Sequence, residues 1–350
     1  MSRFLIHRRT LGAASMAYAA SVFAPMLGAQ PAPAADLGRV TLAVAGQNAM
    51  FHLPVLLADQ LGFFRAEGLE VVLRDFSGGA LALQALQEGS VDVVSGAYEH
   101  TIRQQVRGLA LRSMVLHGRA PQVALGISQR ALPKFESVRD LVGRRVGVSA
   151  PGSSTHTFVR WVLAREGVAP QDVSFVAMAS GAEALAALRS GQVHALCHSD
   201  PIVAQAEQKL ALRVVADGRT LKSSQDLFGG NMPASCLYAA QSFVQKRPDQ
   251  VQALVHAMVH TLKWLQTAEP ADMVKALPTA HLASDRALYL AAFYRMRETF
   301  SPNGLMPDDG PGVALRTLTL AYPELAGSKV DLARTFSNDW VRKARQKFNV

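Results

Sequence analysis

The chain has 350 residues, of which 49% are hydrophobic and 18% are charged. This composition is typical of a globular protein with a sizeable core and excludes an intrinsically disordered chain. The formal net charge is +9, but the basic residues are scattered along the chain, so we expect no nucleic-acid partner.

The first 34 residues have the pattern of a cleavable signal peptide. Arg3, Arg8 and Arg9 precede an apolar, alanine-rich stretch (11–29), and an A-x-A cleavage site follows at 32–34. The adjacent arginines favour a twin-arginine export signal, with a plain secretory signal as the alternative. No cysteine adjoins the cleavage site to carry a lipid, and no later stretch reaches the roughly 20 apolar residues of a spanning helix. We therefore expect a protein that is free in the periplasm and not lipid-anchored.

A repeated unit organises the next part of the chain. "ALQALQEGSVDVVSG" (82–96) aligns without gaps with "ALAALRSGQVHALCH" (184–198), and each copy predicts a short amphipathic helix, a glycine and a buried strand. Chance similarity between two Ala- and Leu-rich helices is the alternative. The elements before each copy also repeat, as strand, helix and strand: 40–46, 53–68 and 69–76 before the first, and 144–150, 153–166 and 172–180 before the second.

Two β-α-β-α-β halves predict an α/β fold with two lobes. Each lobe is expected to hold a mostly parallel sheet with helices on both faces, and the ligand cleft lies between the lobes at the carboxyl ends of the strands. We place lobe 1 at 35–125 and 218–350 and the inserted lobe 2 at 126–217, with crossings near 123–129 and after 217. From 241 onward the pattern is helical, with an apolar face at Val251, Leu254, Val255, Met258, Leu262 and Leu265. We expect this part to pack on lobe 1.

Candidate ligand-binding residues follow the predicted strands. In lobe 1 they are Gln47, Asn48, Phe51, Ser77, Gly78, Gly79, Gly96, Ala97 and Tyr98, with His117 and Asn231 as weaker candidates. In lobe 2 they are Ser153, Ser154, Thr155, His156, His198 and Asp200.

The chemistry of these residues suits a small polar or flat ligand. "SAPGSSTHTF" (149–158) predicts a strand, a loop and a helix start, where free N–H groups and hydroxyls can receive an anion. Ser153 is interpreted mainly as a helix cap, and Asp200 better as a cap than as a ligand group. Tyr98 is the preferred pocket wall, with a packed aromatic as the alternative. Glu99 and His100 are interpreted as outward-facing helix residues.

Signs of catalysis or metal binding are weak. Ser154, His156 and Asp200 are of the residue types that form a hydrolytic set, but nothing in the sequence fixes their arrangement, and no G-x-S-x-G, P-loop or G-x-G-x-x-G motif is present. His256 and His260 have the spacing of a metal pair but no third ligand accompanies them. Cys197 and Cys236 are either a disulfide or, as we favour, two buried thiols. We therefore predict no catalytic residues, no metal and no cofactor.

Four segments carry a family resemblance. They are "LGFFRAEGLEVVL" (61–73), "GGALALQALQEGSVDVV" (78–94), "LVGRRVGVSAPGSSTHTFVRWVLAREGVAPQDVSFV" (141–176) and "AALRSGQVHAL" (186–196). Their order resembles the nitrate/taurine-type periplasmic substrate-binding proteins of ABC importers, a group that includes alkanesulfonate and thiamine-pyrimidine-precursor binders. One departure is His194, where the family usually has Asp. The multi-cysteine motif of the pyrimidine synthases that share this fold is absent.

The resemblance implies a monomeric, two-lobed clamp that binds a small molecule and delivers it to an inner-membrane permease. The expected ligand is a small organic or inorganic anion, such as a sulfonate, carboxylate or nitrate-like ion, or a small heterocycle. A ligand-sensing partner of a membrane receptor is one alternative, and an exported enzyme on the same fold is another.

Overall fold

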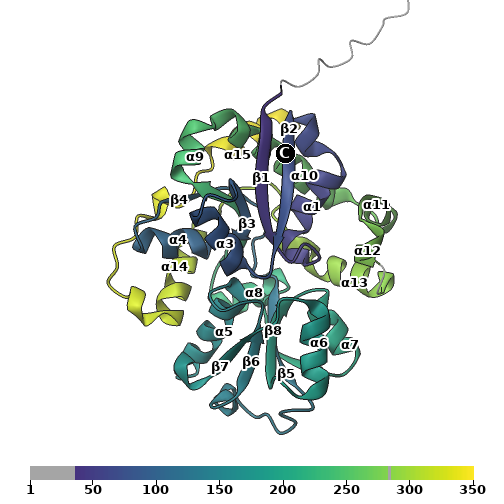
Figure 1. Ribbon diagram of the computed structural model, residues 1–350, viewed down its shortest axis with the longest axis vertical. Helices are drawn as coiled ribbons and strands as arrows, with labels where there is room; N and C mark the ends of the chain where they lie inside the picture. The colour runs from purple at the N-terminus through teal and green to yellow at the C-terminus, as the bar shows by residue number, and fades with distance from the viewer. Residues whose placement is uncertain (1–35, 283–284) are drawn as a thin grey trace, which may run out of the picture. The chain divides into compact units, whose positions relative to one another are not determined.

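Two five-stranded sheets, each with helices on both sides, organise the computed structural model (Figure 1), which describes residues 36–282 and 285–350. The predicted signal peptide at 1–34 lies outside the described residues. The first sheet has the strand order β2-β1-β3-β10-β4, and the second has the order β7-β6-β8-β5-β9. These sheets confirm the predicted two-sheet α/β architecture.

Each sheet is mostly parallel with one antiparallel strand, which is β10 in the first sheet and β5 in the second. The strands of the first sheet are β1 (Gly38–Ala45), β2 (Leu69–Phe76), β3 (Val93–Ala97), β4 (Leu111–Leu116) and β10 (Ser235–Ala240). Those of the second sheet are β5 (Val123–Ser128), β6 (Arg145–Val148), β7 (Ser174–Ala177), β8 (Ala195–Ser199) and β9 (Leu212–Asp217). The chain thus passes between the sheets at 117–122 and 218–234, so 123–128 is a strand of the second sheet instead of a crossing. The exact lobe boundaries stay a prediction.

Helices connect the strands of each half. Those associated with the first sheet are α1 (Leu53–Gln60), α2 (Phe63–Ala66), α3 (Gly79–Gln87) and α4 (Glu99–Val106). Those that follow β6, β7, β8 and β9 are α5 (Ser154–Arg165), α6 (Gly181–Ser190), α7 (Ile202–Gln208) and α8 (Leu221–Phe228). Short 3-10 helices lie at η1 (Met50–His52), η2 (Val138–Leu141) and η3 (Pro170–Asp172).

The C-terminal part is helical, as predicted. It comprises α9 (Gln241–Lys246), α10 (Pro248–Thr267), α11 (Pro270–Ala276), α12 (Thr279–Leu282), α13 (Arg286–Met296), η4 (Arg297–Thr299), α14 (Gly310–Ala321), η5 (Pro323–Leu325), η6 (Leu332–Arg334) and α15 (Asp339–Phe348). The predicted apolar face of α10 is buried completely. Within the described residues, no helix combines the length and apolar character that crossing a membrane requires.

Alternation along β1 shows why helices cover both faces of the first sheet. Val40, Leu42 and Val44 belong to one apolar cluster, which also contains residues of α10. Ala43 belongs to another cluster, together with residues of α3. Because successive side chains of a strand point to opposite faces, each face of this sheet has its own core.

The repeat found in the sequence is also a repeat of hydrogen bonds. After α3, Ser90 N–H donates to the Ala85 carbonyl, and after α6, Gln192 N–H donates to the Ala187 carbonyl, both over 2.9 Å. Asp92 and His194, which lie just before β3 and β8, then contact the first strand of each half, β1 and β6. Thr41 N–H donates to Asp92 Oδ2 over 2.8 Å, and Arg145 N–H donates to His194 Nδ1 over 3.2 Å. His194 therefore replaces the family's aspartate with another acceptor for an equivalent bond.

The C-terminal helices do not pack on the first sheet alone, in contrast to our expectation. Helix α10 contacts β2 and β4, whereas α14 packs on α5 and α13 contacts α7. The side chain of Tyr322, after α14, explains part of this arrangement. Its ring lies between the guanidinium groups of Arg103 from α4 and Arg160 from α5, at 4.4 and 4.1 Å from the ring centroid. Its hydroxyl also hydrogen-bonds Thr157 of α5 over 3.0 Å, so α14 joins the two halves.

Candidate functional site

Two enclosed cavities lie where strand ends of both sheets meet. We call them the aromatic cavity and the histidine cavity, and they share Phe51, Ala97, Val123 and Ser154 in their walls. Phe51 comes from η1 and Ala97 from the end of β3, whereas Ser154 begins α5. Both sheets therefore contribute to the same small space.

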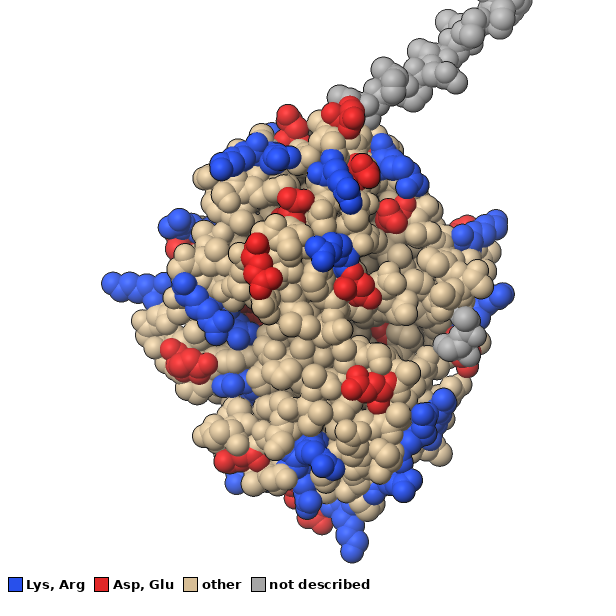
Figure 2. Space-filling view, viewed as in Figure 1, with Lys and Arg blue, Asp and Glu red and all other residues tan. Residues whose placement is uncertain are grey.

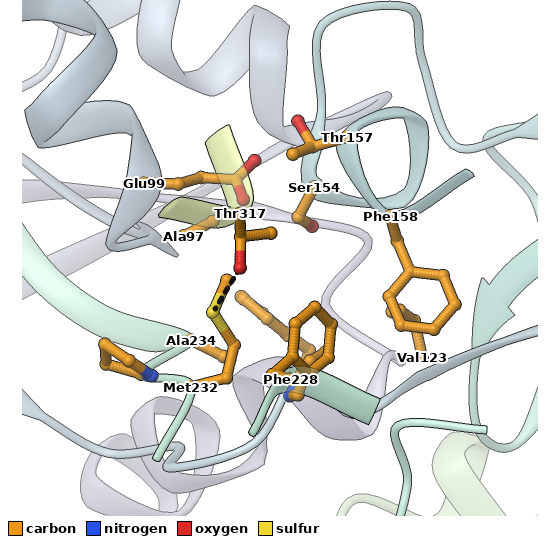
Figure 3. Close-up of a pocket in the computed structure, with 13 residues that line it drawn as sticks. Ala97, Glu99, Val123, Ser154, Thr157, Phe158, Phe228, Met232, Ala234 and Thr317 are labelled. Carbon is orange, nitrogen blue, oxygen red and sulfur yellow. Dashed lines mark hydrogen bonds between the residues drawn. The ribbon is translucent and has the colours of Figure 1, made fainter. Parts of the chain in front are cut away.

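The aromatic cavity is largely apolar (Figure 3). Its other wall residues are Glu99, Pro121, Thr157, Phe158, Phe228, Met232, Pro233, Ala234 and Thr317. The space open to the centre of a water-sized molecule is about 20 Å³. A single water needs roughly 10–15 Å³ by this measure, so the walls are nearly closed around it.

The histidine cavity is more polar and slightly larger. Its other wall residues are Ala45, Ala49, His52, Gly79, Gly96, His100, Ser149, Thr155, His198 and Ser199. Here the corresponding space is about 40 Å³. Within the described residues, neither enclosed cavity has a lysine or arginine in its wall.

Glu99 and His100 face inward, which corrects our interpretation of them as outward-facing residues. Only 5% of Glu99 and 1% of His100 is exposed. In Figure 3 the carboxyl end of Glu99 faces Ser154 and Thr157 of α5, whereas His100 Nδ1 lies 3.0 Å from the Tyr238 hydroxyl. Burial raises the pKa of Glu99 to about 7, although the Thr157 hydroxyl and the Arg103 charge oppose this shift. The cavity thus contains a carboxyl group that is partly protonated at neutral pH.

The buried histidines are neutral at neutral pH. Burial lowers the pKa of His52 to about 4, that of His100 to about 3 and that of His198 to about 4. His52 Nε2 accepts from Ala45 N–H, so its proton lies on Nδ1, which is 2.9 Å from Ser95 Oγ. His198 Nδ1 accepts from Ser199 N–H, which leaves its proton on Nε2.

The start of α5 uses its polar side chains in different ways. Ser153 is the N-cap residue of α5, as predicted, but its side chain makes no capping bond; its Oγ instead accepts from Ala80 N–H, at the start of α3, over 3.0 Å. Thr155 Oγ1 accepts from Ser149 N–H, and His156 Nδ1 accepts from Gly152 N–H. Among the described residues the Ser154 hydroxyl has no hydrogen-bond partner, and it lies in both enclosed cavities. Ser154 is therefore the hydroxyl of this loop that remains available to a ligand.

A wider cleft opens beside the histidine cavity, with about 790 Å³ open to water-sized molecules. Its wall contains Gln47, Asn48, Ser77 and His198 of the predicted set, together with residues 179–182, Arg189 and Lys209. Gly78 lies at a point of close approach between the halves, since a Cβ on it would lie 2.6 Å from Ala150 Cβ.

Tyr98, His117, Asn231 and Asp200 line none of these three spaces. Tyr98 is fully buried, and its hydroxyl lies 2.6 Å from Thr335 Oγ1. His117 is also buried, with Nε2 3.3 Å from Ser95 Oγ. Asn231 bonds Asp309 with both its backbone N–H and its side-chain amide. These groups are thus engaged in the protein itself.

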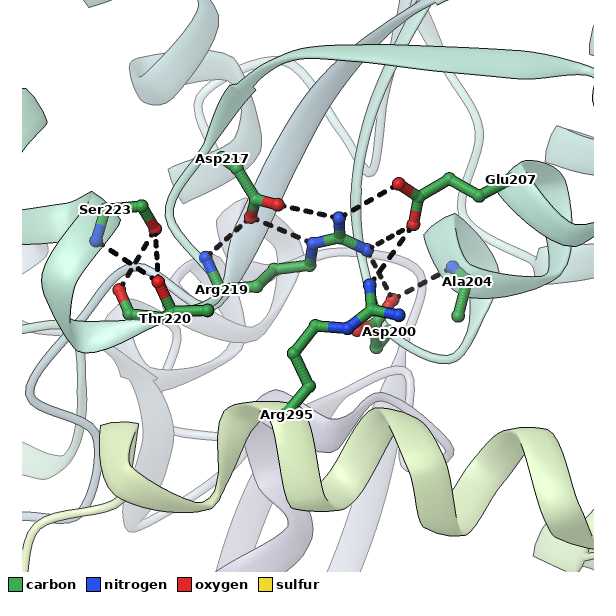
Figure 4. A network of polar contacts seen from close by, with 8 residues as sticks. All are labelled: Asp200, Ala204, Glu207, Asp217, Arg219, Thr220, Ser223 and Arg295. Carbon is green, nitrogen blue, oxygen red and sulfur yellow. Dashed lines mark hydrogen bonds and ion pairs between the residues drawn. The ribbon is translucent and has the colours of Figure 1, made fainter.

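Asp200 belongs to a buried ionic network (Figure 4). Its Oδ1 accepts from Ala204 N–H and from Arg219 Nη1, at 2.9 and 3.2 Å. Arg219 is 1% exposed and also pairs with Asp217 and Glu207. Burial raises the pKa of Asp200, and the charge of Arg219 opposes that shift. The network supports a structural role for Asp200, in line with the capping interpretation.

The remaining sequence candidates are separate from the cavities. His256 Nδ1 bonds Glu67 Oε2 over 2.9 Å, while the His260 ring stacks on Phe63 and Phe348. Cys197 and Cys236 are both free and buried. Within 36–282 and 285–350, no three potential metal-binding side chains of His, Cys, Asp or Glu gather at one place.

Sequence reasoning missed several wall residues. Phe158 appeared only as part of an amphipathic helix face, and Phe228, Met232 and Thr317 had no motif to mark them. The last three lie in the return crossing and in α14, far along the chain from the strand ends that carry the predicted ligand-binding residues. Only three-dimensional packing brings them to the aromatic cavity.

The two sheets, their crossings and the enclosed space between strand ends define a two-lobed protein of the periplasmic-binding-protein fold. Residues 36–277 match the NMT1-like family, and the chain belongs to that family. A solved protein from Bordetella bronchiseptica RB50 is 44% identical, with a TM-score of 0.87, over 89% of this chain and 98% of that one.

More distant relatives include a solved sulfonate-binding protein and two proteins matched by sequence. The alkanesulfonate-binding protein SsuA from Xanthomonas axonopodis pv. citri, solved bound to MOPS, is 21% identical, with a TM-score of 0.63, over 85% of this chain and 97% of its own. Two relatives are matched over part of their length. A Brucella abortus (strain 2308) protein that is named a putative binding protein is 24% identical over 62% of this chain and 64% of its own. A 4-amino-5-hydroxymethyl-2-methylpyrimidine phosphate synthase of Schizosaccharomyces pombe is 23% identical over 68% of each.

Proposed function

We propose that this chain is the solute-binding component of an ABC importer. After export by its cleavable signal, in the twin-arginine form we favour, the monomer captures a small molecule in the periplasm and delivers it to an inner-membrane permease. The described residues would act as a clamp whose halves close over the ligand. Binding proteins among its structural neighbours support this role.

The observation that carries the proposal is the shared wall of the two enclosed cavities. Phe51 and Ala97 approach from the first half, and Ser154 approaches from the second. A ligand held by both halves stabilises the closed arrangement, because its contacts are complete only when the halves meet.

The wall composition bears on the expected ligand classes. The start of α5 offers N–H groups and the Ser154 hydroxyl, which suit an anion. The aromatic cavity instead offers the rings of Phe51, Phe158 and Phe228, which suit a flat organic compound. The present space of about 20 Å³ holds little more than one water, so the halves must separate before an organic ligand enters. Once they separate, the wall favours a small heterocycle or another organic molecule with an apolar part over a bare inorganic ion.

A ligand screen by thermal unfolding tests the proposed function. The library pairs amines, amides, carboxylates and sulfonates on the same rings, with nitrate, bicarbonate and pyrimidines added. A compound at 100 times its dissociation constant should stabilise the protein by about 2.7 kcal/mol. We expect at least one compound to bind at a ratio of one per chain and to be recovered unchanged. A complete absence of binding contradicts the proposal.

An exported enzyme is the second candidate, and the synthase relative is the observation that favours it. Chemical analysis of the bound compound after prolonged incubation separates the two, since an enzyme converts it. A sensor of a membrane receptor would bind its ligand in the same way. Stimulation of ATP hydrolysis by a reconstituted permease distinguishes the importer from that sensor.

A further inference from the structure

Glu99 presents an unpaired polar atom inside the aromatic cavity. It is the first residue of α4, and in Figure 3 its carboxyl end points toward Ser154 and Thr157. Only 5% of the residue is exposed, and its Oε1 atom is buried without a hydrogen-bond partner. A buried acceptor without a donor is unfavourable, so the geometry leaves a place for a donor that comes from outside the chain.

The nearby cation does not fill that place. Arg103 lies one turn further along α4, but its Nη1 donates to the Gly152 carbonyl over 3.0 Å. Its guanidinium also lies over the Tyr322 ring. Since no lysine or arginine among the described residues lines the enclosed cavities, an anionic head group beside Glu99 would have no side-chain counter-charge there.

The rest of the wall defines the body of the ligand. The phenyl rings of Phe51, Phe158 and Phe228 line the same cavity as Glu99, together with the apolar side chains of Met232 and two prolines. Aromatic and aliphatic walls with a few polar groups are typical of sites for flat organic molecules. The Ser154 hydroxyl supplies a second polar contact close to the carboxyl group.

We propose that Glu99 determines ligand specificity by accepting a hydrogen bond from an N–H group of the ligand. The ligand is then a small, neutral or singly protonated nitrogen compound with a flat apolar body, and anions of the same shape are rejected. This inference rests on the proposed function, because it names the ligand class of that site. The proposed ligand class differs from the anionic ligand that the start of α5, taken alone, would favour.

Three probes with one ring and different head groups test the inference. Benzylamine, benzamide and benzenesulfonate are titrated into the purified chain by calorimetry and compared by thermal unfolding. We expect the amine or the amide to bind and the sulfonate to fail. In Glu99→Gln the affinity for the amine should fall about tenfold or more, since a charge-assisted hydrogen bond is lost.

A matched variant and the unliganded protein serve as controls. Glu70→Gln makes the same chemical change at an exposed residue of β2 and should bind like the unaltered protein. Glu99→Gln should melt at or above the temperature of the unaltered chain without ligand, because a buried carboxyl becomes a neutral amide. A variant that is folded but has lost the amine is the supporting result.

The contrary outcomes separate this inference from the proposed function. Binding of benzenesulfonate or other anions without binding of any amine or amide overturns the role of Glu99 but leaves solute binding intact. If Glu99→Gln binds the amine as tightly as the unaltered protein does, the role of Glu99 is also overturned while solute binding stands. If no compound of the screen or of the three probes binds, the proposed function fails and this inference falls with it.

Discussion

Gly78 shows how a single residue permits the two halves to meet. Its φ of +130° lies in a region that side chains rarely adopt, and a Cβ there would lie 2.6 Å from Ala150 Cβ. We expect Gly78→Ala to lower ligand affinity about tenfold or more, since a population shift of about 1.4 kcal/mol away from the closed arrangement is enough for that loss. Calorimetric titration with a ligand from the screen measures the effect.

Gly89 provides the matched control for this change. It also has a positive φ, of +73°, but nothing lies within 4 Å of a Cβ built on it. Gly89→Ala should therefore cost only the roughly 1–2 kcal/mol of a left-handed backbone and should leave affinity unchanged. Equal affinity loss in both variants would show that backbone strain, and not the contact with Ala150, is responsible.

At the scale of elements, the end of α14 acts as a tie between α4 and α5. Tyr322→Ala removes the ring from between Arg103 and Arg160, and we expect it to lower the free energy of unfolding by about 3–5 kcal/mol, as for other buried aromatic residues. Tyr322→Phe keeps the ring and loses only the hydroxyl bond to Thr157, which should cost about 0.5–1.5 kcal/mol. Urea unfolding measures both.

The comparison of these variants also decides between packing and hydrogen bonding. Tyr294 is 37% exposed and its ring contacts Phe293 and Arg297, so Tyr294→Ala is the more exposed aromatic control and should cost clearly less than Tyr322→Ala. If Tyr322→Phe is as damaging as Tyr322→Ala, the hydroxyl bond and not the ring holds the elements together.

The periodicity of apolar residues was sufficient to predict which helices and strands form, but not which side of a helix points inward. The repeat predicted α3, β3, α6 and β8 because glycine ends and apolar spacing are local signals. At the start of α4 the same signals did not distinguish Tyr98 from Glu99 as the wall of the pocket. Adjacent helical residues point about 100° apart, so the choice depends on how α4 packs against α14 and the loop before α5. That contact joins segments distant in sequence, which local patterns do not encode.

For the whole molecule, buried histidines predict a loss of stability in acid. Burial lowers the pKa of His52, His100, His117 and His198 to about 4, 3, 3 and 4, whereas an unfolded histidine titrates near pH 6.5. Between these values the unfolded chain binds more protons than the folded one. The free energy of unfolding should therefore decrease as pH falls below about 6.5, by up to about 1.4 kcal/mol per pH unit for each histidine.

One group opposes this trend and offers a test of it. The raised pKa of Glu99, about 7, means that the folded chain takes up a proton there between roughly pH 7 and 4.5, which stabilises it as pH falls. Glu99→Gln should make the acid loss steeper. The urea concentration at the unfolding midpoint, measured at four pH values from 7.5 to 4.5, gives the slope for the unaltered chain and for Glu99→Gln. A midpoint of the unaltered chain that stays level below pH 6.5 would contradict the predicted effect of the buried histidines.

The hydrogen bond from Ala80 N–H to Ser153 Oγ links the opening of the two halves to the structure at the start of α3. Ser153 belongs to the loop before α5, yet the N–H group that it satisfies lies in the first turn of α3, on the other half. Separation of the halves would expose that amide to solvent and remove the partner of a helix end. The Ala80 amide is thus a natural reporter of opening, and its rate of hydrogen exchange records how often the protein opens without any attached label.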